Sequence, residues 1–420
     1  MKRCPPLLYA GMLALASLQA QAEAPRFSDD VIRIGILNDR SGPYADVSGE
    51  GSAIAARMAA EEFGNRVLGV PVEIVTADHQ NKTDVGAAIA RKWLDADGVD
   101  MIADIANSAV SLAISGLVQT REKLILHNSA SASITGAACT PRTAQWQYNA
   151  WAAAHNVVNR QMVEQGMDSF FIIAVDYALG ESISSVFEQA VQQAGGKVVG
   201  HVRHPLNTTD FSSYLLQARA SGAKAIMLAN AGVDLATAAR QAQEFGLTPG
   251  VQLLAAALTK DVIKATGLQI MEGLQTLSWY EMYRDDQARA WGEAFAARNQ
   301  GRVPTEMQAA TYSSVRSYLK AIEAVGTDQA DVVMAQLKRM PINDAFAKDG
   351  HVRADGLMSH EMYLTRLKSP DQSAGDGDYS NILATLSGSQ VDRPLAQSDC
   401  PLLEDSQRLA AARPQEAAHD

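Results

Sequence analysis

Apolar runs of strand length alternate with segments of helical spacing, and this alternation constrains the fold more than any other feature of the chain. Each run is followed by Ala, Ile and Leu at helical spacing. Strands that are apolar on both faces are typical of parallel sheets that helices cover on both sides. We therefore predict a doubly wound α/β fold. The first series of runs covers residues 31–37, 70–77, 100–106 and 123–127.

The same pattern begins again near residue 169, which indicates a second lobe of similar build. The stretches GVDMIADIANSAVSLA and GAKAIMLANAGVDLATAA, one from each series, both run from a strand through Asn to a helix. A chain of 420 residues is also long for one core, since domains average roughly 150 residues. The second series has runs at 169–175, 197–202, 223–229, 251–257 and 273–279, with helices predicted near 181–194, 211–221 and 232–245.

Beyond residue 279 the chain turns mostly helical, with helices predicted over 285–299 and 304–326 and one further strand over 361–367. Helices without strands of their own must pack on a sheet that already exists. The chain should therefore recross between the lobes near residues 280 and 350, which makes a hinge of three crossovers. The predicted boundaries are 28–148 plus 281–350 for the first lobe, 149–280 plus 351–385 for the second, and 386–420 for a peripheral C-terminal tail.

The first 24 residues have the pattern of a secretory signal peptide. Lys2 and Arg3 precede an apolar run from Leu7 to Leu18, and small residues follow at the spacing of an Ala-x-Ala cleavage site. The run is too short to span a bilayer, and no later stretch approaches about 18 uninterrupted apolar residues. We expect an exported, soluble protein, with a retained amino-terminal anchor as the alternative.

Cysteine use agrees with export, and the net charge bears on the possible partners. Cys4 leaves with the predicted signal peptide, so Cys139 and Cys400 remain as an even pair in an oxidising compartment. One disulfide between them is predicted, and two buried free thiols are the alternative. The formal charge of −11 argues against nucleic acid or anionic lipid as a partner, because both require a basic face.

The common signatures of α/β enzymes are missing from the sequence. Gly49-Glu50-Gly51 lacks the third glycine of a dinucleotide fingerprint, since Ile54 stands there. Neither a phosphate-binding loop nor a nucleophile elbow occurs. His201 and His204 lie three apart in a predicted strand, so their side chains point to opposite faces, and we expect a solvated pair instead of a metal site. The sequence predicts no cofactor and no metal.

Polar turns of small residues follow the strands at their carboxyl ends, where open parallel sheets bind ligands. Hydroxyls, amides and free backbone N–H groups at helix starts suit a small polar or anionic ligand. Any single turn is more simply explained as a helix cap, but several turns that converge on one cleft favour a binding site. These turns are 38–44, which includes Ser41 and Tyr44, then Asn107-Ser108, 129–131, Asp176-Tyr177 and Asn230-Ala231.

Aromatic residues stand in or beside the same loops and the interlobe segments, where a flat ring can stack between lobes. For Trp146 and Tyr148 we prefer core packing. Tyr44 and Tyr177 lie in loops and are better candidates for ligand contact. Trp279 and Tyr280 complete the set.

Five segments give the chain a family resemblance that extends over nearly everything after the signal peptide. They are Ser41-Gly42-Pro43-Tyr44 after the opening strand, ADHQNKTDVGAAIARKW (77–93), DYALG (176–180), AGV with RQAQEFGL (231–247), and PTEMQAATYSSV (304–315). Together they resemble the periplasmic solute-binding proteins of ATP-driven importers, in the branched-chain amino-acid-binding (type I) branch.

This resemblance implies two lobes that close on a small ligand over a three-stranded hinge, with no reaction catalysed. It also implies a periplasmic monomer whose macromolecular partner is the membrane permease of the importer. Tyr177 and Asn230 match cleft positions of the second lobe, and Gln308 opens a helix that borders the cleft. The contacts of the family with a ligand carboxylate fall on Asn107, Ser108, Ser129 and Ser131.

One departure from the family pattern concerns the ligand. Amino-acid binders place a carboxylate after the fourth strand of the second lobe to pair with the ligand ammonium, but here the stretch reads Ala255-Ala256-Ala257-Leu258. A buried ammonium without a partner costs several kcal/mol, comparable with micromolar binding at about −8 kcal/mol. We predict that leucine, isoleucine and valine bind poorly, unless Asp176 or Asp234 substitutes for the missing acid.

Residues 340–370 look more like the branch of the family that takes up aromatic or other non-amino-acid carboxylates. The predicted ligand is therefore a small organic acid, and aromatic acids are included in this prediction. Three alternatives stay open at this point. They are an amino-acid-binding transport protein, a sensory protein that presents its ligand to a membrane receptor, and a secreted α/β enzyme.

Overall fold

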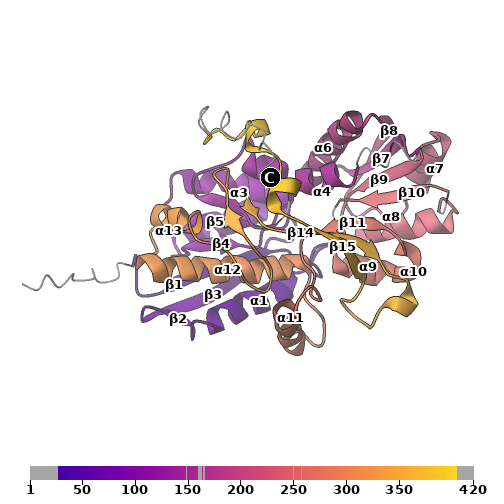
Figure 1. The fold of residues 1–420 in the computed structure, drawn as a ribbon. Helices are drawn as coiled ribbons and strands as arrows, with labels where there is room; N and C mark the ends of the chain where they lie inside the picture. The colour runs from indigo at the N-terminus through magenta and orange to yellow at the C-terminus, as the bar shows by residue number, and fades with distance from the viewer. Residues whose placement is uncertain are drawn as a thin grey trace, which may run out of the picture.

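The chain folds into two lobes that lie side by side, joined by strands that run between them (Figure 1). The structure is a computed structural model, and it describes residues 27–147, 149–158, 163, 166–248, 250–256 and 258–403. The predicted signal peptide, Cys4, Tyr148, Ala257 and the end of the predicted tail lie outside the described residues.

The first lobe is built on a six-stranded sheet with the order β2-β3-β1-β4-β5-β6. Neighbouring strands pair in parallel except for the β2–β3 pair, which is antiparallel. Residues 34–38 of the first strand are all buried, and because side chains alternate between faces, both faces of this strand are covered. The strands are β1 (Ile32–Asn38), β2 (Arg66–Val67), β3 (Val70–Asp78), β4 (Met101–Ala103), β5 (Leu124–His127) and β6 (Thr143–Gln145).

Helices from both ends of the chain cover this sheet. α12, which lies more than two hundred residues after α1, packs along it, and a Cβ on Gly51 would come within 2.3 Å of Gln308 Nε2. The Gln308 amide therefore lies directly over Gly51, and a side chain at this position would displace it. The helices of this lobe are α1 (Gly49–Glu61), α2 (Thr83–Asp95), α3 (Ser108–Ser115), α11 (Asp286–Arg298), α12 (Glu306–Val325) and α13 (Ala330–Leu337).

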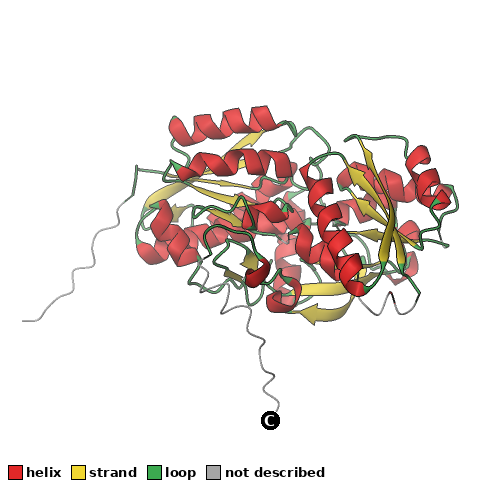
Figure 2. Ribbon diagram, turned by 90° about the horizontal axis from the view of Figure 1, so that it is seen from above, coloured by secondary structure: helices red, strands yellow, loops and turns green. Residues whose placement is uncertain are grey.

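The second lobe repeats the design with a four-stranded parallel sheet in the order β10-β9-β7-β8. All residues of its central strand β7 (Ser169–Val175) are buried. Figure 2 shows the two sheets as separate yellow layers with red helices on their faces. The other elements are α4 (Ala150–Asn156), α6 (Ala178–Ala194), β8 (Lys197–His204), α7 (Ser212–Ala220), β9 (Ala225–Ala229), α8 (Gly232–Glu244), β10 (Gln252–Ala255), α9 (Lys260–Thr266) and α10 (Leu268–Met271).

A three-stranded antiparallel sheet in the order β11-β14-β15 connects the lobes. It consists of β11 (Gln275–Ser278), β14 (Met362–Leu367) and β15 (Ser380–Leu386). The expectation that residues 273–279 continue the parallel sheet of the second lobe was wrong. A short apolar run can join a parallel or an antiparallel sheet. Here β11 pairs with β14, which lies more than eighty residues later in the sequence. The predicted fold, two parallel-sheet lobes with a three-crossover hinge, is confirmed.

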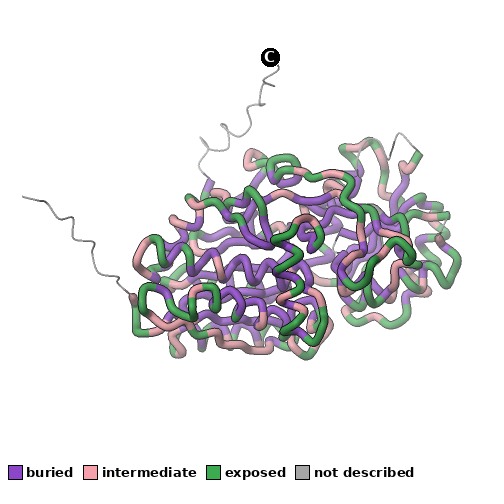
Figure 3. The backbone as a smooth tube through the Cα atoms, turned by 60° about the horizontal axis from the view of Figure 1, so that its bottom comes forward, coloured by how far each residue is buried: buried purple, intermediate pink, exposed green. Residues whose placement is uncertain are grey.

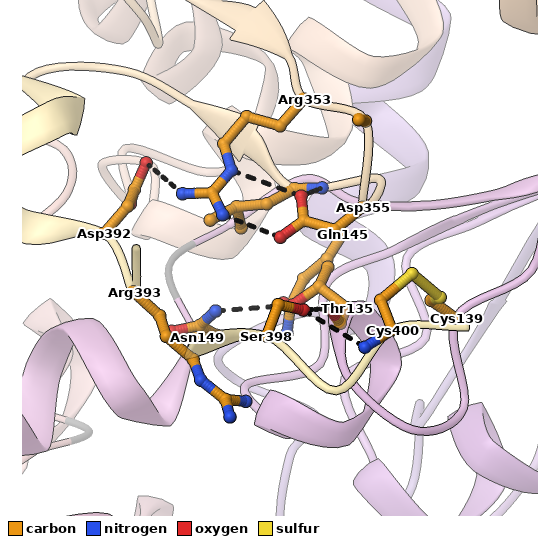
Figure 4. A network of polar contacts seen from close by, with 12 residues as sticks. Thr135, Cys139, Gln145, Asn149, Arg353, Asp355, Asp392, Arg393, Ser398 and Cys400 are labelled. Carbon is orange, nitrogen blue, oxygen red and sulfur yellow. Dashed lines mark hydrogen bonds and ion pairs between the residues drawn. A yellow bond between two sulfur atoms is a disulfide. The ribbon is translucent and has the colours of Figure 1, made fainter. Parts of the chain in front are cut away.

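The described part of the C-terminal segment returns to the first lobe and is fastened there. The predicted disulfide joins Cys139 to Cys400 with the two Cα atoms 5.6 Å apart. Next to it, Ser398 Oγ donates a hydrogen bond to the Thr135 carbonyl oxygen at 3.2 Å. Figure 4 shows this contact beside the ion pair of Arg353 with Asp355. The segment passes α14 (Gly388–Val391) on its way.

Burial follows the layers of the two lobes. In Figure 3 the buried backbone runs through the interior of both lobes, and exposed segments lie at the outer helices and loops. Several short elements were not predicted, including β6, α13, β15 and the pair β12 (His351–Val352) and β13 (Met358–Ser359). The predicted domain boundaries stay a prediction.

Candidate functional site

The two lobes touch each other where the loop after β1 meets the turn after β9. Gly232 opens α8 with φ +58°, and a Cβ at this position would lie 3.2 Å from the Pro43 carbonyl oxygen. Glycine is therefore required both by its left-handed backbone conformation and by the close approach of the opposite lobe. The described structure is a closed arrangement of the lobes at this point.

A small cavity lies at this junction, at the carboxyl ends of strands from both sheets. Its volume is about 20 Å³, which is close to the space that one water needs and far below the roughly 300–1,000 Å³ of ordinary ligand pockets. Its position agrees with the general location of ligand sites in open parallel sheets. The lining residues are Tyr44, Val47, Ala106, Ala130, Leu179, Ala231, Gly232, Thr259 and Met307.

Two tyrosine hydroxyls close the junction. Tyr44 comes from the first lobe and Tyr177 from the second, and their hydroxyl groups hydrogen-bond to each other. Burial raises the pKa of Tyr44 and of Tyr177 above the usual tyrosine value, and the nearby carboxylate of Asp234 raises both pKa values further. Both hydroxyls are therefore neutral near pH 7 and can each donate and accept one hydrogen bond.

Two of the predicted serines form a buried hydroxyl cluster at the start of α3. Ser129 Oγ donates to Ser108 Oγ at 3.1 Å, and the Ser131 backbone N–H donates to Ser129 Oγ at 3.2 Å. Gln145 fixes the loop of residues 129–131, because its Nε2 donates to the carbonyl oxygens of Ser129 and Ser131. The structure therefore brings these serines together in the first lobe, and their contact with a ligand stays a prediction.

Asn107 and Asn230 both have structural partners. The Asn107 side chain caps α3 by accepting a hydrogen bond from the Val110 N–H at 2.9 Å, and its amide also bonds the side chain of Asn81. This is the capping role that sequence reasoning weighed for each single turn. Asn230 is fully buried, and its Nδ2 lies 3.0 Å from His204 Nε2.

Gln308 and Ser41 lie beside the junction and do not line its cavity in the described structure. Gln308 forms a capping box with Thr305, and its Nε2 donates to the Asp46 carbonyl oxygen at 3.2 Å. It thereby fixes the loop that carries Tyr44. Ser41 is exposed and donates to Asp78 Oδ2 at 2.6 Å. Among the predicted contact residues, Tyr44 lines the cavity and Tyr177 reaches the junction through their shared hydrogen bond.

The other aromatic residues serve the core. Trp146 is fully buried, and its Nε1 donates to Ser313 Oγ at 3.0 Å, in agreement with the preferred interpretation. Tyr280 is also fully buried and stacks on Phe346 with ring centroids 6.3 Å apart. Trp279 is buried next to it. These two rings pack inside the molecule, close to the connecting sheet.

Asp234, named above only as a substitute for a missing acid, is a buried carboxylate in the first turn of α8. It is 1% exposed, and its Oδ2 accepts a hydrogen bond from the Asn207 N–H at 3.1 Å. Burial raises its pKa to about 6, although backbone N–H groups of Asn207 and Thr208 oppose the shift. The available signal was a single acid in an otherwise uncharged first turn of the helix. Asp176, the other candidate, is exposed and pairs with Arg203.

Sequence reasoning missed a buried charge cluster that bridges the lobes beside the hinge. Lys260 of α9 places its Nζ 3.2 Å from Glu281 Oε2 and 3.6 Å from Glu306 Oε1. Burial raises the pKa of Glu306 to about 7, with Lys260 opposing the shift. Glu281 follows the hinge strand β11, and Glu306 opens α12 of the first lobe. Residues this far apart in the sequence offer no local pattern that announces their contact.

The expectation of a solvated histidine pair was wrong for one member. His201 lies near the surface, 3.2 Å from Glu188, but His204 is fully buried against Asn230. The strand ends at His204, where the loop after it folds over the side chain. The described residues contain no group of three or more His, Cys, Asp or Glu side chains placed to hold a metal ion. In the same part of the chain, no helix has the length and apolar character needed to cross a membrane.

Comparison with known proteins shows which family the chain is similar to. The profile of a family described as periplasmic binding protein matches residues 31–376. A crystal structure of a periplasmic binding protein from Burkholderia mallei is 39% identical, covers 89% of this chain and 100% of its own, and superposes with a TM-score of 0.86.

Two further relatives are similar over most of the chain. A branched-chain amino acid ABC transporter periplasmic ligand-binding protein from Burkholderia xenovorans LB400 is 37% identical, with a TM-score of 0.79 and coverage of 88% of this chain and 99% of its own. Leu/Ile/Val-binding protein homolog 6 of Brucella melitensis is 27% identical over 88% of this chain and 94% of its own length.

The fold also occurs in a protein that was solved with an aromatic acid. A solute-binding protein of an ABC transporter from Rhodopseudomonas palustris, in complex with 4-hydroxybenzoate, has a TM-score of 0.74. It covers 85% of this chain and 97% of its own, and it is 23% identical. At this identity the likeness concerns the fold alone.

Proposed function

Because the chain belongs to the periplasmic binding protein family, we propose that it clamps a small organic acid, aromatic in its preferred form, between its lobes and delivers it to the membrane permease of an ABC importer. The observation that carries the proposal is the Tyr44–Tyr177 hydrogen bond, which brings polar groups of both lobes together at one cavity. The protein would act in the periplasm as a monomer and release its ligand unchanged.

The chemistry of the junction supports an acid as the ligand. Ser108 and Ser129 offer hydroxyl groups beside the N-terminus of α3, where the helix dipole favours a negative group. Val47, Leu179 and Met307 line the cavity with apolar surface, which suits a ring or an aliphatic body. A protein of this fold can hold an aromatic acid, since the R. palustris protein was solved with 4-hydroxybenzoate.

The absence of a carboxylate from residues 255–258, directly at the end of β10, disfavours branched-chain amino acids. Ala255 and Ala256 are buried there, next to Leu258. Ammonium groups that lose water without gaining a charged partner bind weakly. Leucine, isoleucine and valine are therefore proposed to be poor ligands, even though two relatives carry branched-chain or Leu/Ile/Val names.

The mechanism follows from what each state of the protein can contact. A cavity of about 20 Å³ has no room for an aromatic acid, so the lobes must part for the ligand to enter. In the open state the ligand contacts one lobe, and only closure lets it contact both. To shift the lobes from mostly open to mostly closed, the ligand must favour the closed state by about 5 kcal/mol. Charge-assisted hydrogen bonds together with the apolar contacts are of this order.

A titration of the purified protein tests the proposal. We expect calorimetry to show saturable binding of benzoate or a substituted benzoate, with leucine weaker by at least about tenfold. A ligand that binds only the folded protein also raises its melting temperature, which gives an independent reading. Leucine as the tightest ligand, or conversion of any bound acid into a product, would contradict the proposal.

A further inference from the structure

The loop between β5 and β6 carries residues of the candidate site. Ala130 lines the small cavity at the junction of the lobes, and the Ser129 hydroxyl bonds that of Ser108 at the start of α3. Residues 131–139 then form a compact turn that is held by its own backbone hydrogen bonds. The position of this turn therefore bears on the position of the Ser129 hydroxyl.

The C-terminal segment, residues 387–403, is fastened to this turn at two places. The disulfide joins Cys139, the last residue of the turn, to Cys400. Ser398 Oγ donates a hydrogen bond to the Thr135 carbonyl oxygen at 3.2 Å and accepts one from the Cys400 N–H at 3.2 Å. One attachment is thus covalent, and the other is a hydrogen bond between groups that are both buried.

Thr135 connects this attachment to the serines. Its Oγ1 donates to Gln145 Oε1 at 3.3 Å, and Gln145 Nε2 donates to the carbonyl oxygens of Ser129 and Ser131. Figure 4 shows Ser398, Thr135 and Gln145 beside the disulfide. Thr135 and Gln145 are 5% and 0% exposed, so water competes little for these bonds. A continuous set of hydrogen bonds therefore runs from the C-terminal segment to both serines.

On the side of α6 the loop is not closely packed. A cavity of about 380 Å³ lies there between the loop, α6 and the C-terminal segment, and its lining includes residues 131–133 of the loop and Arg393 and Asp399 of the segment. Close packing is what ordinarily holds buried residues in one position. Because it is missing on this side, the position of the loop depends more on the disulfide and on the hydrogen bonds through Thr135.

We infer that the C-terminal segment, held by the Cys139–Cys400 disulfide, positions the loop of Ser129 and Ser131 for ligand binding, so that the oxidised protein binds its ligand more tightly than the reduced protein. This role rests on the proposed function, and it makes Cys139, Cys400 and Ser398 positioning residues that do not touch the ligand. A loop that is ordered before binding loses less conformational entropy when the ligand arrives. Reduction releases the segment, and binding must then order the loop as well.

The wild-type protein provides the first test, in its two redox states. Two electrons and two protons from dithiothreitol convert the disulfide into two thiols, and the reagent closes into its own cyclic disulfide. We expect calorimetry to show about tenfold weaker binding of benzoate or 4-hydroxybenzoate after reduction. Melting curves establish that both states are folded. Equal affinity in the two states overturns the inference, and the proposed function then stands. If neither acid binds to either state, the proposed function fails, and the inference with it.

The reduction potential separates positioning from simple stabilisation of the fold. If the oxidised state binds the ligand tenfold more tightly, saturating ligand must make the potential of the disulfide more negative by about 30 mV, since the couple transfers two electrons. A disulfide that only stabilises the fold gives no shift while both states are folded. The potential is measured in dithiothreitol redox buffers with and without the bound acid, and alkylation counts the free thiols. An unchanged potential overturns the inference.

Ser398→Ala tests the segment with the disulfide intact, and it decides the matter if the reduced protein does not fold. The variant removes the hydroxyl that bonds the Thr135 carbonyl oxygen, and we expect about threefold weaker binding of the same acid. Ser389→Ala is the matched control, because Ser389 is an exposed serine of the same segment whose hydroxyl bonds Ser387. Amide hydrogen exchange over residues 129–139 should rise in Ser398→Ala alone. Equal affinity and equal exchange in the two variants overturn the inference.

Discussion

Two of the contacts that join the lobes are built from opposite kinds of chemistry. At the cavity, the neutral hydroxyls of Tyr44 and Tyr177 meet. Beside the hinge, the ionisable side chains of Lys260, Glu281 and Glu306 meet, and each of them is nearly fully buried. One contact joins two neutral groups, and the other places three ionisable groups where little water reaches them.

The difference suggests separate roles in closing the lobes. A neutral hydrogen bond contributes only about 0.5–1.5 kcal/mol, and a ligand hydroxyl or carboxylate can replace it at little loss. A buried ion pair is different, because removing one partner strands the other charge and costs about 3–5 kcal/mol. We therefore expect a bound ligand to break the hydrogen bond between the two tyrosines. The charge cluster, in contrast, should keep α9, the hinge and α12 in fixed positions relative to one another.

Removal of the cation should have the largest effect. We expect Lys260→Met to lower the free energy of unfolding by about 3–5 kcal/mol, because two carboxylates remain buried without a positive partner. Urea unfolding followed by circular dichroism measures the change. Lys264→Met is the matched control, since Lys264 lies one turn further along α9, is half exposed and pairs with Asp376. It should cost less than about 1 kcal/mol, and equal losses in both variants would contradict the role given to the cluster.

The charge cluster should also make stability depend on pH. Burial raises the pKa of Glu306 from 4.5 to about 7. Between these two pH values, the folded protein therefore keeps a proton that the unfolded chain has released. The stability that this proton contributes is lost as the pH rises through the window. The Glu306→Gln variant has no proton to lose at this position. Between pH 5 and pH 8 we therefore expect its free energy of unfolding to rise by roughly 1–3 kcal/mol relative to that of the wild type.

Urea unfolding of both proteins at the two pH values measures this difference. Other buried acids, such as Asp104 and Asp392, are present in both proteins, so their contributions cancel in the comparison. Stability curves that run parallel for wild type and Glu306→Gln would show that Glu306 does not titrate in this range.

The closeness of the lobes at the cavity can be tested at Gly232. An added Cβ would press on the Pro43 carbonyl oxygen at 3.2 Å, so Gly232→Ala should hinder closure and weaken ligand binding by about tenfold, or roughly 1.4 kcal/mol. Gly222→Ala is the control, because Gly222 also has a left-handed φ of +70° but no described atom within 4 Å of its added Cβ. Both variants share the backbone strain, and only Gly232→Ala should lose affinity. Calorimetric titration compares them.

The smallest effect is expected at the tyrosine pair. A double-mutant cycle with Tyr44→Phe, Tyr177→Phe and the double variant should give a coupling energy of about 0.5–1.5 kcal/mol in ligand-free unfolding. A coupling energy as large as the loss in Lys260→Met would remove the contrast between the two contacts. Additive losses would show that the hydroxyls do not stabilise the closed state together.

Much of the scaffold follows from local sequence. The apolar run 169–175 coincides with β7, and the helix predicted over 304–326 coincides with α12 to within two residues at each end. Such segments are predictable because hydrophobic periodicity and end signals act within a few residues. The Thr305 capping box at the start of α12 is one such signal.

The candidate site was predicted less completely. Ser108 and Ser129 follow strands that neighbour each other, so their proximity could be read from the strand order of a parallel sheet. The capping bond of Asn107 is local, because its partner is Val110. The contact of Asn230 with His204 and the hydrogen bond from Asn207 to Asp234 join residues of different loops, and such contacts have no periodic trace in the sequence.

The sequence alone determined that this chain forms two lobes of parallel sheet covered by helices, because continuous apolar runs can be buried on both faces only in such layers. Tertiary structure decided the rest. It paired β11 with β14, brought Lys260 to Glu281 and Glu306, and set Tyr44 against Tyr177. These contacts join residues that are distant in the sequence and become neighbours only in the folded molecule, so no single segment predicts them.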